Sequence, residues 1–295
     1  MFCRSRIFFR EVKITMRTLD CSRITQAVAQ LCIDANVLLP PETAKLLEQA
    51  RESEHSPLGR GVLQDLCDNY RLAAAEGLPI CQDTGMAVVF ARVGQDVHIS
   101  GGDFEQAINE GVRQGYRQGL LRCSVVADPL RRTNTGDNTP AVIHTFIVPG
   151  DRLELILAPK GFGSENMSAM KLFLPSCSPE DILDFITETV SRAGSKPCPP
   201  VILGVGLGGT VEKAALLAKQ GLLRPMDKRS SDPFYAELEQ QALSRINSLG
   251  LGPQGFGGST TALAVNIEAF PTHIAGLPCV VNMSCHATRH SKIIL

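Results

Sequence analysis

The sequence predicts an α+β fold, a single large domain in which helices flank a mixed β-sheet. Segments with the periodicity of amphipathic helices alternate along the chain with short apolar or alternating segments typical of strands. The 295 residues, 44% of them hydrophobic, suffice for a large core. The sequence shows no internal repeat and no low-complexity linker, so nothing in it divides the chain into separate domains.

The first third of the chain predicts helices followed by a strand. Helical periodicity covers residues 22–37, 41–54 and 57–76. The third helix should end at Gly77, because glycine accepts the left-handed conformation of a helix C-cap. Residues 86–94 (MAVVFARVG) then predict a buried strand.

The middle of the chain predicts one further helix and a β-hairpin. Residues 103–120 have helical spacing, and Asp103 is a suitable N-cap. The apolar segments 141–148 and 152–158 are separated by the turn sequence Pro-Gly-Asp, which is typical of two strands that pair with each other.

The last third predicts alternating helices and strands. A helix over residues 179–194 begins at Pro179 and is stopped by Gly194. The remaining predicted elements are a strand at 201–206, helices at 211–223 and 232–250, and strands at 260–270 and 277–285.

Charge and hydropathy exclude two classes of function. The net charge is −1, whereas a nucleic-acid-binding protein normally carries a basic excess. No apolar run reaches the roughly 18 residues that a membrane-spanning helix needs. Residues 1–15 are basic and lack the apolar core of a secretory signal, so we expect residues 1–16 to form a poorly ordered or mis-started extension.

The ten cysteines point to a reducing, cytoplasmic compartment, because no export signal precedes them. No pair is spaced as Cys-x-x-Cys, so neither a zinc knuckle nor a thioredoxin-like site is indicated. Cys32 and Cys67 fall on apolar helix faces and are expected to be core residues.

Four glycine-rich segments lie at junctions between the predicted elements, at residues 134–140, 160–166, 204–209 and 252–261. Glycine lets a ligand approach the backbone closely, so together these loops suggest a polar, anion-lined site. The third loop formally satisfies GxGxxG. A dinucleotide site is not favoured there, because the acidic residue expected about 20 positions later is missing.

Three cysteines stand at the edges of predicted elements, beside polar or rigid neighbours. They are Cys81 in PICQDTG, Cys198 in KPCPPVILGVG and Cys285 in NMSCHATRH. Three thiolates that converge from distant segments suit an iron–sulfur cluster in which a fourth iron stays open to substrate. Spacing alone does not select these three from the ten.

Longer motifs identify a resemblance that does select them. The segments LPICQDTG, NTGDNTPAVIH, APKGFGSENMSAMK, CPPVILGVGLGGTVEKAALLAKQGLLRP and GLGPQGFGGSTTALAVNIEAFPTHIAGLPCVVNMSCHATRH resemble class I fumarate hydratases, and in particular the N-terminal domain that some organisms make as a separate alpha subunit. The resemblance covers residues 17–295. L(+)-tartrate dehydratase alpha subunits share CQDTG and GPQG, but the form KGFGSEN favours a fumarase.

The resemblance implies a 4Fe-4S cluster bound by Cys81, Cys198 and Cys285. Its open iron would act as a Lewis acid on the C2 hydroxyl of malate in a reversible hydration of fumarate. The resemblance places Gln82 and Asp83 against the dicarboxylate, with Asp83 a catalytic candidate. Without it, both side chains would be read as caps of a turn.

Further site residues follow from the same resemblance. Arg122 is a candidate carboxylate clamp or an exposed structural arginine, and His273 is a candidate catalytic proton relay or a hydrogen-bonded core histidine. His286 and Arg289 are expected to orient the cluster. The KGFGSEN loop should present Gly161, Ser164, Glu165 and Asn166 to the substrate, while Lys160 should pair with a carboxylate or with Glu165.

The resemblance also implies a partner. Full-length class I fumarases continue into a C-terminal domain that supplies more carboxylate-binding groups and the presumed base. We therefore expect a beta subunit that carries this domain, an α2β2 assembly, and an apolar docking surface around the CQDTG and KGFGSEN loops. The alternatives are an L(+)-tartrate dehydratase alpha subunit and a non-catalytic scaffold that carries the cluster.

Overall fold

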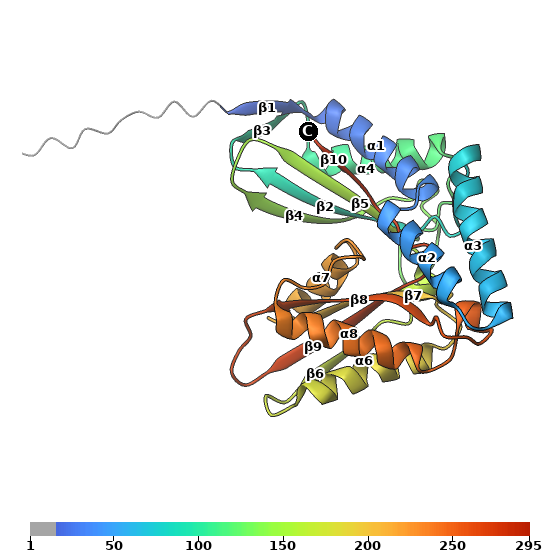
Figure 1. The fold of residues 1–295 in the computed structure, drawn as a ribbon. Helices are drawn as coiled ribbons and strands as arrows, with labels where there is room; N and C mark the ends of the chain where they lie inside the picture. The colour runs from blue at the N-terminus through green and yellow to red at the C-terminus, as the bar shows by residue number, and fades with distance from the viewer. Residues whose placement is uncertain (1–15) are drawn as a thin grey trace, which may run out of the picture.

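The strands of the protein form two four-stranded sheets that face each other, with a short two-stranded ladder at one corner (Figure 1). The computed structural model describes residues 16–295. The extension expected over residues 1–16 therefore lies almost wholly outside the described residues. The α+β class is confirmed, although the strands divide between two mixed sheets where one was expected.

The first sheet has the order β10-β5-β2-β4 and carries two helices on its outer face (Figure 1). Side chains of both helices pack with those of the central strands in one apolar cluster. A ladder of β1 and β3 runs beside this layer. The elements are β1 (Arg17–Asp20), α1 (Cys21–Val37), β2 (Met86–Gly94), β3 (Val97–Ser100), α4 (Phe104–Gln118), β4 (Val142–Val148), β5 (Leu153–Lys160) and β10 (Ser291–Ile294).

The second sheet has the order β6-β9-β7-β8, with α6 and α8 on its outer face and α7 on the face toward the first sheet (Figure 1). Its core is a second apolar cluster. The elements are β6 (Ala169–Phe173), α6 (Pro179–Ala193), β7 (Val201–Gly208), α7 (Val211–Gly221), α8 (Pro233–Asn247), β8 (Ala262–Phe270) and β9 (Leu277–Ser284).

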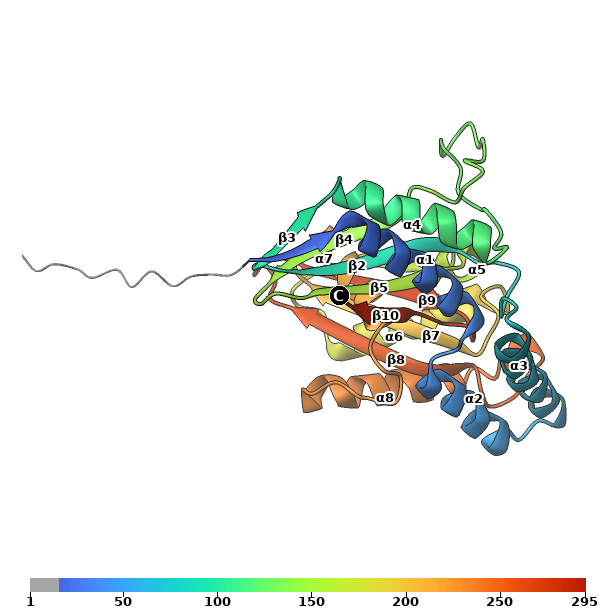
Figure 2. The ribbon, with the colours of Figure 1, turned by 90° about the horizontal axis from the view of Figure 1, so that it is seen from above.

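Two antiparallel helices close one end of the molecule, where the two layers meet (Figures 1 and 2). These are α2 (Pro41–Ser53) and α3 (Pro57–Glu76). Two very short helices, α5 (Phe162–Glu165) and η1 (Pro253–Gly255), lie inside glycine-rich loops. The long predicted helices are confirmed with ends shifted by a few residues, and α3 does end at Gly77, whose φ is 66°.

The predicted hairpin is wrong. β4 and β5 do not pair, because β2 lies between them, parallel to β4 and antiparallel to β5. The Pro-Gly-Asp connection crosses the end of β2, where the Asp96 amide donates to the Gly150 carbonyl. β2 is almost wholly buried, so the interior of the sheet stabilises it better than an edge position would.

The GxGxxG segment is explained by packing between a helix and a strand. A Cβ atom on Gly204 would lie 2.0 Å from the Ala218 carbonyl oxygen, and one on Gly206 would lie 1.9 Å from the Ala214 carbonyl oxygen. Only glycine lets α7 approach β7 at this distance. The structure thus gives these glycines a role that needs no dinucleotide.

Two other expectations concern buried and apolar segments. Cys32 and Cys67 are fully buried, which confirms their assignment to the core. Within residues 16–295, no helix combines the length and the apolar character needed to cross a membrane.

Candidate active site

The three selected cysteines come from three segments that meet where the second sheet adjoins α3. Cys198 precedes β7 and Cys285 directly follows β9. The two strands are antiparallel, with Ile202 opposite Ser284, so the start of one and the end of the other share one edge of the sheet. Cys81 arrives on the loop that follows α3.

A buried arginine ties the segment of Cys285 to that of Cys81. Arg289 donates through Nη2 to the Asp83 carbonyl at 2.8 Å and to Asn36 Oδ1 at 3.0 Å, and through Nη1 to the Ala287 carbonyl at 3.0 Å. The Ile80 amide in turn donates to the Asn36 carbonyl. These bonds fix the loop of Cys81 against the loop of Cys285.

The segment of Cys198 is held by the loop that contains η1. Gln254 donates through both its backbone amide and its side-chain amide to the Pro199 carbonyl, at 2.7 and 2.8 Å. His286 Nδ1 lies 3.1 Å from the Cys198 carbonyl, so the tautomer with a hydrogen on Nδ1 donates there. Cys198 itself adopts a left-handed conformation, with φ at 55°.

The three thiols are close enough to influence one another electrostatically. Burial raises the pKa of Cys198, and the neighbouring Cys285 and Cys81 raise it further. Burial also raises the pKa of Cys285, while the Arg289 guanidinium and the Ala287 amide act in the opposite direction. A bound cation would favour all three thiolates.

This donor set fits a cluster better than a single ion. Within the described part of the chain, no three histidine, cysteine or acidic side chains are grouped closely enough to bind one metal ion. Thiolates that bind different irons of one cluster stand farther apart than ligands of one ion. Arg289 Nε is buried without a hydrogen-bond partner among the described residues, which leaves one donor available for an acceptor outside them.

Asp83 links the Cys81 loop to the KGFGSEN loop. Its Oδ1 accepts a hydrogen bond from the Gly85 amide, and its Oδ2 accepts one from the Phe162 amide at the start of α5, both at 3.0 Å. A Cβ on Gly161 would lie 3.2 Å from Oδ2, so glycine permits this approach. Each carboxylate oxygen keeps a second lone pair for a water or a substrate hydroxyl.

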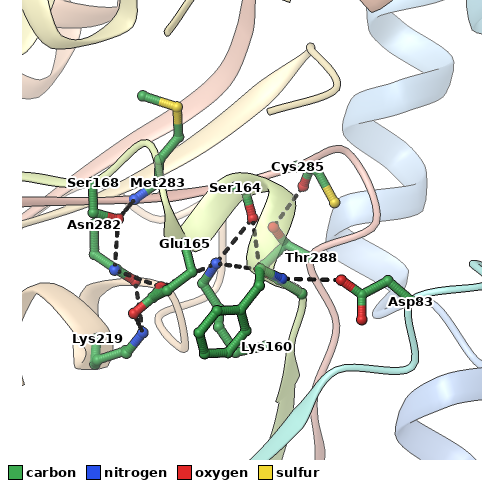
Figure 3. Close-up of polar contacts among 12 residues, drawn as sticks. Asp83, Lys160, Ser164, Glu165, Ser168, Lys219, Asn282, Met283, Cys285 and Thr288 are labelled. Atoms are coloured by element: carbon green, nitrogen blue, oxygen red, sulfur yellow. Dashed lines mark hydrogen bonds and ion pairs between the residues drawn. The ribbon is translucent and has the colours of Figure 1, made fainter. Parts of the chain in front are cut away.

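Charged residues of the KGFGSEN loop form a network of buried and partly buried ion pairs with Lys219 of α7 (Figure 3). Lys160 Nζ lies 2.9 Å from Ser164 Oγ and 3.2 Å from Glu165 Oε2, and Glu165 also forms an ion pair with Lys219. Burial lowers the pKa of Lys160 to about 8, although Glu165 opposes this shift. Burial alone would raise the pKa of Glu165, but the two lysines outweigh it and lower that pKa.

The predicted contact residues of the site therefore fall into two groups. The Ser164 hydroxyl donates to the Gly161 carbonyl, and Glu165 is an acceptor that is already paired, so neither side chain has a hydrogen to offer a carboxylate. Gln82, Arg122 and Asn166 have exposed side chains. The Arg122 carbonyl accepts from Thr84, which places Arg122 beside the Cys81 loop.

His273 is not brought to the cysteines within the chain. It is exposed, on the loop between β8 and β9, and its Nδ1 accepts a hydrogen bond from the Ala275 amide at 3.1 Å. The eight residues of β9 separate this loop from Cys285. At about 3.3 Å per residue, β9 places the His273 loop more than roughly 20 Å from Cys285. An apolar pocket of about 470 Å³ adjoins the His273 loop, and none of Cys81, Cys198 and Cys285 lines it.

Sequence reasoning missed the residue that anchors the η1 loop. Glu54, fully buried at the end of α2, accepts hydrogen bonds from the amides of Ser259 and Thr260 at 2.8 and 2.9 Å and from the Ser56 amide at 3.0 Å. Burial raises the pKa of this carboxyl, but the hydrogen bonds from Ser259, Ser56 and Thr260 outweigh burial and lower it to about 2. Only Ser259 and Thr260, which lie 205 and 206 residues away in sequence, reveal this role.

Comparison with known proteins gives consistent results. Residues 25–294 match the fumarate hydratase (Fumerase) family. A putative L(+)-tartrate dehydratase subunit alpha from Methanocaldococcus jannaschii is 40% identical over 275 residues, which span 91% of this chain and 96% of the relative. The L(+)-tartrate dehydratase subunit alpha of Escherichia coli O157:H7 is 30% identical over 278 residues, spanning 93% and 91%.

The Glu54 anchor predicts a loss of stability at neutral pH. Glutamine in its place would turn an amide NH2 group toward backbone donors, and we expect Glu54→Gln to lower the free energy of unfolding by about 2–3 kcal/mol. Because the folded pKa lies below the usual value of 4.5, this stabilisation is present above pH 4.5 and is lost as the pH falls toward 2.

Urea unfolding of both proteins between pH 7 and pH 3 measures this difference. The matched control is Glu52→Gln, two residues earlier in the chain, where the side chain is 71% exposed. A loss of unfolding free energy that stays constant down to pH 3 would contradict the role assigned to Glu54. An equal loss in the Glu52→Gln control would contradict it as well.

Proposed function

Because the chain belongs to the fumarate hydratase (Fumerase) family, we propose that it is the alpha subunit of an iron–sulfur hydro-lyase that interconverts fumarate and (S)-malate. The observation that supports this most strongly is the meeting of Cys81, Cys198 and Cys285 beside the KGFGSEN loop. The three thiols come from segments far apart in sequence, and hydrogen bonds hold those segments in place.

Cys81, Cys198 and Cys285 would bind a 4Fe-4S cluster, and the buried Arg289 would offset its negative charge. Such a cluster supplies an iron with an open coordination position, a Lewis acid for the C2 hydroxyl of the substrate. His286 holds the Cys198 carbonyl and thereby orients the segment that carries this ligand.

The exposed polar side chains around the cysteines would bind the dicarboxylate. Arg122 offers a planar guanidinium for one carboxylate, while Gln82 and Asn166 offer amide hydrogens. Gly161 brings the backbone close, and Asp83 holds the two loops together with lone pairs left for a water. Ser164 and Glu165 then act by fixing the loop rather than by touching the substrate.

A partner subunit would complete the site. The two relatives reported above carry the designation subunit alpha, which implies a further subunit in those proteins. His273 lies at the far end of the sheet, so we propose that the partner supplies the base for the C3 proton. An α2β2 assembly would follow if the pairs associate about a two-fold axis.

Exposed apolar side chains around the site mark where that partner would dock. Leu120, two residues before Arg122, is 90% exposed, and Phe256, two residues after Gln254, is 62% exposed. Leu78 and Phe162 are exposed on the Cys81 and KGFGSEN loops. A partner that covered this surface would also keep water from the cluster and from the substrate charges.

Tartrate is the second candidate substrate. The 40% identity to a putative L(+)-tartrate dehydratase subunit alpha favours it, whereas the KGFGSEN form of the loop favours fumarate. The two reactions differ by one hydroxyl, which a polar pocket discriminates strongly.

The cluster assignment predicts which cysteines matter. Anaerobically purified protein should contain iron and acid-labile sulfide in the ratio of a 4Fe-4S cluster. Serine in place of Cys81, Cys198 or Cys285 should abolish cluster retention, because a hydroxyl does not replace a thiolate on iron. Cys32→Ser and Cys67→Ser, in the core, are the controls and should retain it. Zinc without sulfide in the purified chain would overturn the assignment.

Activity should require the partner. The chain alone, loaded with its cluster, should show little turnover, and addition of the candidate beta subunit should restore malate dehydration. Turnover of malate, L(+)-tartrate and methyl-substituted dicarboxylates by the complex then ranks the substrates. Faster turnover of tartrate would make this a tartrate dehydratase, and a loaded complex inactive on all of them would favour the scaffold.

The docking surface predicts a residue-specific loss of association. Leu120→Asp should weaken binding of the beta subunit by about tenfold or more, since it places a charge in an apolar contact. Leu120 has a φ of 51°, which aspartate tolerates better than leucine, so the fold should not suffer. Ile274→Asp, at an equally exposed position beside His273, is the control. Equal affinities for the two variants, measured by titration calorimetry, would exclude this surface.

A further inference from the structure

We propose that Lys219 is a positioning residue for the reaction: through Glu165 it fixes the KGFGSEN loop, and it gives the charged group around Glu165 the net positive charge that favours a dicarboxylate. The inference rests on the proposed function for its substrate, but the contacts that support it are independent of the cluster. Lys219 lies on α7, far from the loop in sequence, and although it falls within a quoted motif the sequence analysis gave it no role.

The contacts place Glu165 between two cations and an amide (Figure 3). Lys219 Nζ forms an ion pair with Glu165 Oε1 and lies 3.4 Å from Asn282 Oδ1. The other carboxylate oxygen accepts from Asn282 Nδ2 at 2.9 Å and lies 3.2 Å from Lys160 Nζ. Asn282 Nδ2 also donates to Ser168 Oγ, which continues the network beyond the loop.

The two ends of α5 are held from different parts of the molecule. At its first residue, the Phe162 amide donates to Asp83 on the Cys81 loop. At its last residue, Glu165 is held by Lys219. A four-residue helix has little stability of its own, so these tertiary bonds decide where the loop lies.

The support beneath Lys219 is rigid. α7 rests directly on β7, because Gly204 and Gly206 let the Ala218 and Ala214 carbonyls approach the strand backbone. Lys219 follows Ala218 and is itself mostly buried. The position of Lys219 is therefore fixed by the sheet that also carries Cys198 and Cys285 at its edge. Lys219 in turn holds Glu165, so the loop keeps a fixed position relative to these cysteines.

The charges also matter for a dianionic substrate. Glu165 alone would place a negative charge next to the loop that should receive carboxylates, whereas Glu165 with Lys160 and Lys219 carries a net charge of +1. Removal of Lys219 leaves a neutral pair. Burial lowers the pKa of Lys219, but Glu165 opposes that shift and favours the charged ammonium.

Direct contact of Lys219 with the substrate is not favoured by its location. Lys219 lines a pocket of about 550 Å³ between the two sheets, together with His144 and Asn282 and with Lys160, Phe162 and Glu165 of the KGFGSEN loop. None of the three cysteines lines this pocket. Lys219 thus acts on the substrate site through Glu165.

The test measures malate turnover by the cluster-loaded chain with its beta subunit. It compares the single variants Lys219→Met, Lys219→Arg and Glu165→Gln with a double variant that combines Lys219→Met and Glu165→Gln. Lys213→Met is the matched control, since Lys213 lies at the other end of the same helix, over the ring of Phe270. We expect Lys219→Met to raise KM for malate about tenfold or more, with kcat changed less than threefold. Lys219→Arg should recover most of the loss.

The double variant separates positioning from a general loss of stability. If Lys219 acts through Glu165, the double variant should be no worse than Glu165→Gln alone, because the two effects are not additive. Additive increases in KM would overturn the inference, as would a KM for Lys219→Met within twofold of the Lys213→Met control.

A second measurement needs neither cluster nor activity. Amide hydrogen exchange over residues 162–168 in the isolated chain should be at least tenfold faster in Lys219→Met than in Lys213→Met, while α6 stays protected in both. Unchanged exchange over this loop overturns the positioning role. Should the wild-type complex turn over no dicarboxylate, the proposed function fails, and this exchange measurement still decides the role of Lys219.

Discussion

A buried guanidinium joins segments that would otherwise have no reason to meet. Arg289 follows the last cysteine by four residues, yet its hydrogens go to the Asp83 carbonyl and to Asn36 on α1. A buried charge without hydrogen-bond partners would strongly destabilise the fold. The Cys81 loop and α1 therefore have to supply acceptors at these positions. The convergence of Cys81 with Cys285 depends on this interaction, and the loop contacts described above are built around it.

Around that centre, charged side chains fix two of the glycine-rich loops, each from a different element. Glu54 receives the amides of the η1 loop, and Glu165 is held by lysines from β5 and α7. Glycines make the close approaches possible, and buried ionic hydrogen bonds then select one geometry among the many that glycine allows. The loops therefore form a preorganised surface on two rigid sheets, as a site that binds a small dianion requires.

The roles of the polar residues around the cysteines follow from the hydrogen bonds that each side chain is still able to donate. A carboxylate substrate needs donors, and the donor hydrogen of Ser164 is already used by the Gly161 carbonyl. The exposed amides of Gln82 and Asn166 and the exposed Arg122 keep theirs. Within the KGFGSEN loop, Ser164 thus holds the backbone in place, whereas the Asn166 amide is free to bind a ligand.

Local patterns in the sequence determined the long helices, the central strands and the core positions of Cys32 and Cys67, because periodicity and capping act over a few residues. The motifs also identified the family, and the choice of three cluster cysteines that they imply stays a prediction. Sequence did not determine that β2 separates β4 from β5, nor that the strands form two sheets, since strand order depends on which strand buries most apolar surface. Only the tertiary structure placed His273 away from the cysteines and brought Glu54, Gln254 and Lys219 to their loops. Such contacts join residues that are distant in the chain, and no local spacing encodes them.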